Sequence, residues 1–144
     1  MGIDLRVETE SGGVVTEMGD PRSCVGRFLV MSDLKTTVCL RFIDPYGDTV
    51  FNGSQIPVLE AEIEAAVSKL SVARLRAARE ARLEGAIDAR WQQPVIDQLR
   101  ADVGTDLSQS IELDEIRGHM RRILEAVRLA ITSGPHVYLR FVGD

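Results

Sequence analysis

Three arginines have the residue types and spacing to recognise negatively charged groups. They are Arg6, Arg41 and Arg140, and each alternates with aliphatic or aromatic residues in a segment rich in β-formers. Because successive side chains of a strand point to opposite faces, the apolar residues of each segment share one face and the arginine points to the other. A guanidinium group captures carboxylates and phosphates through paired hydrogen bonds. The pattern predicts an arginine-bearing sheet face that binds an acidic partner or ligand.

The same pattern has a second interpretation, an ordinary solvated face of a sheet. Antiparallel sheets often expose one face to water, and arginine opposite a carboxylate is a common cross-strand pair. Asp4 and Glu8 alternate with Arg6, and Tyr138 stands two residues before Arg140. The two interpretations differ in whether carboxylates of the same chain already bind the guanidinium groups.

A turn in the middle of the chain supplies further candidate contact residues, namely Asp44, Tyr46 and Asp48. Proline and glycine within the turn, with an aspartate before them, favour a tight reversal. We therefore predict a hairpin of two strands, 37–43 and 49–51. Asp44 and Asp48 lack the spacing of a calcium-binding loop, so no metal site is predicted here.

The remaining residues with reactive side chains form no catalytic pattern. His119 and His136 have no neighbouring nucleophile or carboxylate at a spacing typical of a proton relay, and we predict that both lie at the surface or an edge. Cys24 and Cys39 are predicted to be small buried hydrophobic residues. The sequence predicts no catalytic residues, no metal and no cofactor, and hence a protein that is not an enzyme.

The elements expected around these residues define the fold class. An N-terminal hairpin, a short helix over 21–31, the central hairpin, several helices and a C-terminal strand follow in order. The last helix is predicted to begin at Ser110 and to end at Gly134 and Pro135. We expect an α+β domain whose mainly antiparallel sheet has about five strands, with helices packed on one face.

The stretch 71–110 is rich in Ala, Arg and Glu and has few large aliphatic residues. Helix propensity there is high, but the face available for burial is thin. Its arginines are interleaved with acidic residues, which is more typical of a solvated helix than of a nucleic-acid site. The stretch is a candidate for homo-oligomer contacts.

Length and composition limit the remaining choices. The 144 residues fit a single domain, 1–144, and the fractions of 44% hydrophobic and 27% charged residues are typical of a folded protein. A net charge of −5 argues against nucleic acid as a partner. No apolar run is long enough to span a bilayer, and the start Met1-Gly2-Ile3-Asp4 has no export pattern, so a cytoplasmic location is expected.

Three blocks carry a resemblance to a known group: the opening MGIDL, the central LRFIDPYGDTVFN and the ending YLRFVGD. With them the chain resembles a group of small, uncharacterised bacterial proteins, and the stretch from about 71 to 110 is an addition to the shared pattern. The resemblance implies a bacterial, compact, cytoplasmic domain and brings no catalytic residues with it.

Three functional hypotheses follow. The leading one is a non-enzymatic protein-interaction domain, most concretely an immunity protein that neutralises a cognate toxin. Its size and acidic balance fit such a protein by analogy. The second is a small-ligand or phosphate-binding domain that uses the arginines. The third is a structural homo-oligomer that pairs through 71–110.

Overall fold

The computed structural model describes residues 2–144 and shows an α+β fold. Its sheet is made of β1 (Ile3–Thr9), β2 (Val14–Met18), β3 (Asp48–Phe51) and β4 (Val137–Gly143), in the order β2-β1-β4-β3 with every neighbouring pair antiparallel. The helices are α1 (Cys24–Met31), α2 (Ile56–Ser68), α3 (Val72–Asp88), α4 (Gln93–Asp102) and α5 (Asp106–Thr132). The predicted fold class is confirmed, with a sheet of four strands rather than about five among the described residues.

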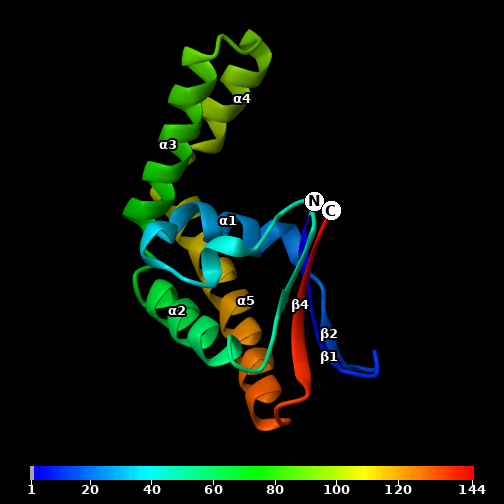
Figure 1. Cartoon of the computed structure of the whole chain (residues 1–144). Helices are drawn as coiled ribbons and strands as arrows, with labels where there is room; N and C mark the ends of the chain where they lie inside the picture. The colour runs from blue at the N-terminus through cyan, green and yellow to red at the C-terminus, as the bar shows by residue number, and fades with distance from the viewer. Residues whose placement is uncertain (1) are drawn as a thin grey trace.

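The helices lie on one side of the sheet, and the opposite face of the sheet is bare (Figure 1). The first and last strands pair along their whole length at the centre of the sheet, with Arg6 directly opposite Arg140. Their alternate residues are buried as the pattern predicts: Ile3, Leu5, Val7, Val137, Leu139 and Phe141. The two ends of the chain consequently meet, and the Gly2 amide donates to an Asp144 carboxylate oxygen at 2.6 Å.

The core lies between this sheet and helices α1, α2 and α5. Phe28 of α1 is completely buried. The ring of Phe51 packs edge to face against the ring of Phe141, with centroids 5.9 Å apart. Aromatic pairs favour this geometry because the positive ring edge meets the negative ring face. The apolar side of the sheet is thus closed by helices, which leaves only its polar side open.

The predicted central hairpin is wrong. Residues 40–42 form a short 3₁₀ turn, and β3 pairs with β4 instead of with 37–43. The amides of Val38 and Cys39 donate to the Glu62 carboxylate of α2, at 2.8 and 2.7 Å, so they are not free for a strand ladder. Thr49 Oγ1 donates to the Phe42 carbonyl at 3.1 Å and fixes the end of the turn.

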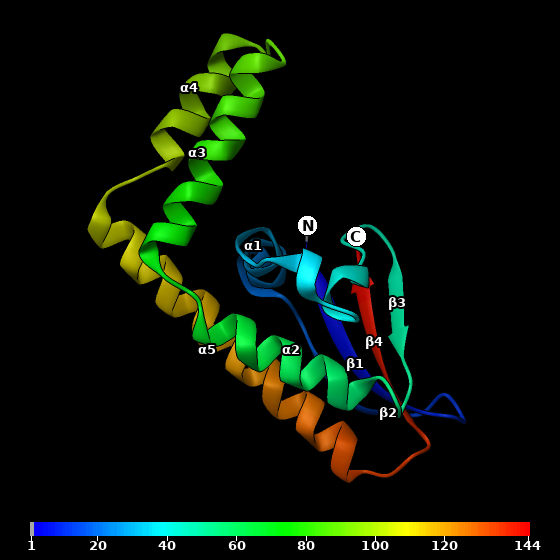
Figure 2. The same cartoon turned by 60° about the vertical axis from the view of Figure 1, so that its left-hand side comes forward.

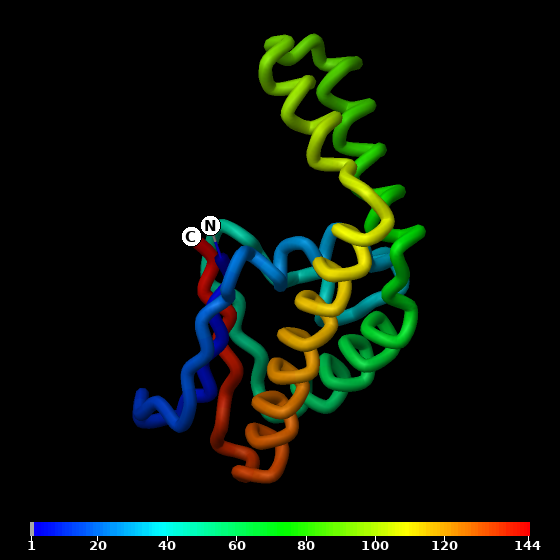
Figure 3. Tube along the Cα trace, turned by 180° about the vertical axis from the view of Figure 1, so that it is seen from behind, coloured from blue at the N-terminus to red at the C-terminus, as the bar shows by residue number. Residues whose placement is uncertain are grey.

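The stretch 71–110 contains two antiparallel helices that extend away from the rest of the molecule as an arm, α3–α4 (Figure 3). A small separate core of Ala86, Ile96 and Leu99 joins them. The prediction that α5 begins at Ser110 is wrong, because Thr105 and Ser108 form a reciprocal capping box one turn earlier. Helix α5 therefore runs from the base of the arm to the sheet.

Gly143, near the end of β4, lies under the turn 44–47. Its amide donates to the Gly47 carbonyl at 3.0 Å, and a Cβ on Gly143 would be 2.4 Å from the Pro45 carbonyl carbon. Gly143→Ala should therefore lower the free energy of unfolding by about 1–3 kcal/mol, because backbone must move. Gly85→Ala is the control, since its added Cβ would meet no atom within 4 Å beyond its chain neighbours and the backbone of its own helix.

Urea unfolding followed by circular dichroism measures both variants. Gly85 lies in the interior of α3, so its replacement by alanine should leave stability unchanged or raise it, by up to about 1 kcal/mol. Equal stability of Gly143→Ala and the unaltered protein would show that the turn is not seated on β4.

Candidate functional site

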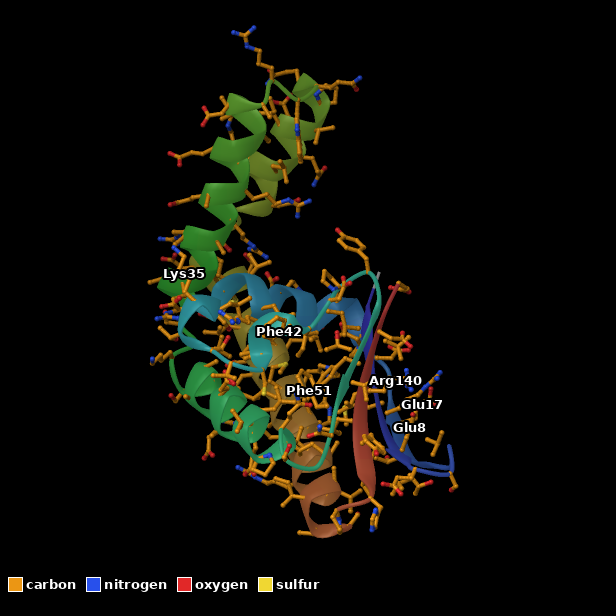
Figure 4. All side chains as sticks on the ribbon, viewed as in Figure 1. Glu8, Glu17, Lys35, Phe42, Phe51 and Arg140 are labelled. Atoms are coloured by element: carbon orange, nitrogen blue, oxygen red, sulfur yellow. The ribbon has the colours of Figure 1, made fainter. Side chains whose placement is uncertain are left out.

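The uncovered polar side of the sheet is the first candidate site, and we call it the open sheet face. Its members share a side of the sheet opposite the buried residues: Arg6, Glu8, Glu17, Asp48, Val50, Tyr138 and Arg140. Figure 4 shows Glu8, Glu17 and Arg140 projecting on the side away from the helices. Three of the four strands meet at Arg140, which lies between Arg6 of β1 and Val50 of β3.

Both arginines of this face already bind carboxylates of the same chain. Arg140 Nε donates to the two carboxylate oxygens of Glu8, each at 3.1 Å, and Arg140 Nη1 donates to Asp48 at 3.0 Å. The hydrogen bond to Glu8, with that to Asp48, raises the pKa of Arg140 above its ordinary value. Arg6 Nε donates to Glu17 at 3.0 Å.

These pairs make the open sheet face acidic rather than cationic. Three carboxylates, from Glu8, Glu17 and Asp48, are paired with only two guanidinium groups. Glu10 adds a further carboxylate at one end of the strands, where it accepts from Tyr138 Oη at 3.4 Å and lies 3.0 Å from His136 Nδ1. The face therefore has carboxylate charge in excess, in an ordered arrangement.

The predicted site residues divide into two groups. One group lies together on the open sheet face: Arg6, Asp48, Tyr138 and Arg140. The other group lies outside this face: Arg41, Asp44 and Tyr46. The placement of Arg41 on the sheet is wrong, because the 3₁₀ turn at 40–42 directs it away; its guanidinium lies 4.9 Å from the centre of the Phe42 ring.

Asp44 and Tyr46 lie in the turn over Gly143 rather than on the sheet. Asp44 Oδ1 accepts from the Tyr46 amide at 2.8 Å, which stabilises the turn itself. The Tyr46 side chain is 73% exposed and lines a cleft beside α1. Asp44 therefore has a structural role, and Tyr46 belongs to a different surface from the arginines.

His119 of α5 is buried, so its prediction as a surface residue is wrong. It is 1% exposed and its Nε2 lies 3.4 Å from Oδ1 of Asp20, a carboxylate that is itself fully buried. Burial lowers the pKa of His119, while the nearby Asp20 charge opposes that shift. The one signal in the sequence was its position three residues after Ile116, on the apolar side of the helix.

The predictions of an exposed His136 and of buried Cys24 and Cys39 agree with the structure. His136 is exposed beside Glu10 at the edge of the sheet. Cys24 and Cys39 are buried free thiols, and burial raises the pKa of each. A raised thiol pKa lowers the fraction of the nucleophilic thiolate at neutral pH.

A cleft of about 660 Å³ is the second candidate site. It lies between α1, the base of the α3–α4 arm and the turn that carries Tyr46. Sequence reasoning missed it, because segments near residues 30, 45, 80 and 100 come together only in the folded chain.

Within residues 2–144, no three His, Cys, Asp or Glu side chains are placed to share a metal ion. No described helix combines the length and apolar character that crossing a bilayer requires. No protein-family model, curated protein or solved structure matches the chain. A functional proposal must therefore come from the geometry of the two candidate sites.

Proposed function

We propose that this chain is a non-enzymatic protein-interaction domain of the immunity type, which binds a basic protein such as a cognate toxin through the open sheet face. One observation carries the proposal: a sheet face without helix cover, on which carboxylates outnumber the arginines that they bind. The resemblance to small bacterial proteins is in keeping with this proposal and adds no residue to it.

Apolar groups on the open sheet face support a protein partner over a free ion. Val50 is 44% exposed directly opposite Arg140, and the half-buried ring of Tyr138 lies two residues along β4. Protein interfaces characteristically combine tyrosine, arginine and apolar contacts at the centre with a polar rim. The open sheet face has this composition.

The charge of the chain supports a basic partner. The net charge is −5, and the carboxylates of the open sheet face are held in fixed positions by their arginines. Complementary potentials accelerate association and exclude partners of the wrong sign. Binding should therefore weaken as salt is added, because exposed charges are screened beyond about 10 Å at 0.1 M ionic strength.

The ligand-binding alternative has less support on this face. A phosphate or carboxylate ligand needs guanidinium donors, and Arg6 and Arg140 already donate to Glu8, Glu17 and Asp48. A ligand would have to displace those carboxylates and leave them near its own negative charge. The electrostatics therefore favour a cationic protein over an anionic small molecule.

Homo-oligomer formation through the arm is the second candidate, and one observation favours it. Ile87, Trp91 and Val95 are each more than two-fifths exposed near the end where α3 meets α4. Tryptophan is enriched among residues that dominate binding energy at interfaces. A light-scattering mass equal to that of one chain, at high protein concentration, would end this candidate.

Val50→Lys tests the main proposal. A cationic side chain on β3, beside Arg140 of the open sheet face, should reduce capture of the partner from host extract by at least about tenfold, through repulsion and lost apolar contact. Val58→Lys is the matched control, because Val58 of α2 is 41% exposed against 44% for Val50.

Quantitative mass spectrometry of proteins retained by each tagged variant provides the readout. A basic protein retained by the unaltered chain and by Val58→Lys, but lost with Val50→Lys, supports the proposal. If the two lysine variants retain the same proteins in the same amounts, the open sheet face is not the contact surface.

A further inference from the structure

The cleft beside α1 has a wall of apolar side chains. Helix α1 contributes Leu29, Val30 and Met31, and α3 contributes Leu75 and Ala78. Val30 is 71% exposed there, beside the buried side chains of Leu29 and Met31. The volume of the cleft, about 660 Å³, falls in the range of roughly 300–1,000 Å³ that is typical of small-molecule sites.

A network of charged groups closes one side of the cleft. Glu112 of α5 accepts from Arg27 Nη1 at 2.5 Å and is also ion-paired with Arg79. Arg79 Nη1 donates in addition to the Val103 carbonyl at 3.3 Å. These contacts join α1, α3 and α5, so the base of the arm is held at a fixed distance from α1.

Arg82 differs from the other two arginines of the cleft. It lies three residues after Arg79 on α3, so both side chains are on the same face of the helix. Within residues 2–144 Arg82 has no hydrogen bond or ion pair, although it lines the cleft. It is therefore a guanidinium group available to a ligand at the edge of an apolar wall.

We propose that this cleft binds a small amphipathic monocarboxylate. The apolar part of the ligand lies against Val30, Met31 and Ala78, and its carboxylate accepts hydrogen bonds from Arg82. A single negative charge fits best, because Asp102 also lines the cleft and repels a second one. The site is separate from the open sheet face and does not depend on the proposed function.

Decanoate is a suitable probe, titrated into the full chain below its micelle concentration and followed by calorimetry. Arg82→Gln should weaken decanoate binding about tenfold or more, because a charge-assisted hydrogen bond is lost. Arg100→Gln is the matched control: Arg100 is an exposed arginine of α4 that lies 3.6 Å from Asp97 and does not line the cleft. Decyltrimethylammonium, which has the same chain and opposite charge, should bind much more weakly.

Ala78→Trp provides a second test, since the larger side chain takes the space proposed for the apolar part of the ligand and should abolish binding while circular dichroism shows an intact fold. Methyl chemical shifts of Met31 in the unaltered protein should move with decanoate and keep their positions in Ala78→Trp. The proposal is overturned if decanoate does not bind, if Arg82→Gln and Arg100→Gln bind it equally, or if the cationic probe binds as well.

Discussion

Asp20→Ala should lower the free energy of unfolding by about 3 kcal/mol or more. The Asp20 carboxylate is fully buried and accepts hydrogen bonds from the Ile3 amide at 2.9 Å and the Val25 amide at 3.1 Å. Alanine would leave both amides without their acceptor, at about 1–3 kcal/mol each. Since Ile3 opens β1 and Val25 lies in the first turn of α1, both the sheet and α1 lose their connection to this carboxylate.

Asp33→Ala is the matched control for this experiment. Asp33 also accepts from a backbone amide, that of Lys35 at 3.3 Å, but it is exposed and caps only a short 3₁₀ turn. Its loss should cost at most about 1 kcal/mol. Urea unfolding at neutral pH compares the two variants, and similar losses would show that Asp20 does not organise the N-terminal half.

Stability should fall as the pH is lowered through the titration of His119. Burial lowers the pKa of His119, with Arg122 acting in the same direction and Asp20 against it. As the pH drops below the ordinary histidine value of about 6.5, the unfolded chain takes up a proton before the folded chain does. The stabilising effect of neutral His119 is therefore complete above that value and is lost as the pH falls toward its folded pKa.

The free energy of unfolding, measured by urea denaturation from about pH 7.5 to pH 5.5, tests this expectation. His119→Met, which cannot titrate, should give a flatter pH dependence than the unaltered protein. His136→Met is the comparison, because His136 is the other histidine of the chain and lies exposed at the sheet edge rather than in the core. The same slope in all three proteins would contradict a titrating His119 in the core.

Strand periodicity was sufficient to predict the parts of the open sheet face that come from β1 and β4. Alternation along Ile3–Thr9 and Val137–Gly143 sorts each strand into a buried and an exposed set, and the register places Arg6 opposite Arg140. The alternation along a strand does not predict which carboxylate binds each arginine. Glu17 and Asp48 reach these arginines from the neighbouring strands, so the acidic balance of the face depends on strand order.

The central segment shows how a tertiary contact overrides a strand pattern. Residues 37–43 alternate like a strand, yet Val38 and Phe42 are 65% and 59% exposed while Leu40 is buried. The Glu62 carboxylate binds two amides that a strand would have used, and nothing in the local sequence identifies an acceptor more than twenty residues away. The strand-like pattern of 37–43 is therefore a feature of its composition and not of its conformation.

The buried Asp20–His119 contact and the cleft beside α1 could not be predicted from the sequence either. The buried contact between Asp20 and His119 joins residues 99 positions apart. The cleft depends on how the arm leaves the body beside α1, which Figure 2 shows and no local pattern encodes. Both features arise from packing between elements, where propensity and periodicity carry little information.

A photo-reactive phenylalanine analogue at position 50, compared with the same analogue at position 58, tests the central claim most directly. Crosslinking in the native host should join position 50 to one basic protein, and added salt should diminish the product. Position 58, on α2 and similarly exposed, should give no such product. Crosslinks to that protein from position 58 but not from position 50 would contradict the assignment of the open sheet face as the binding surface.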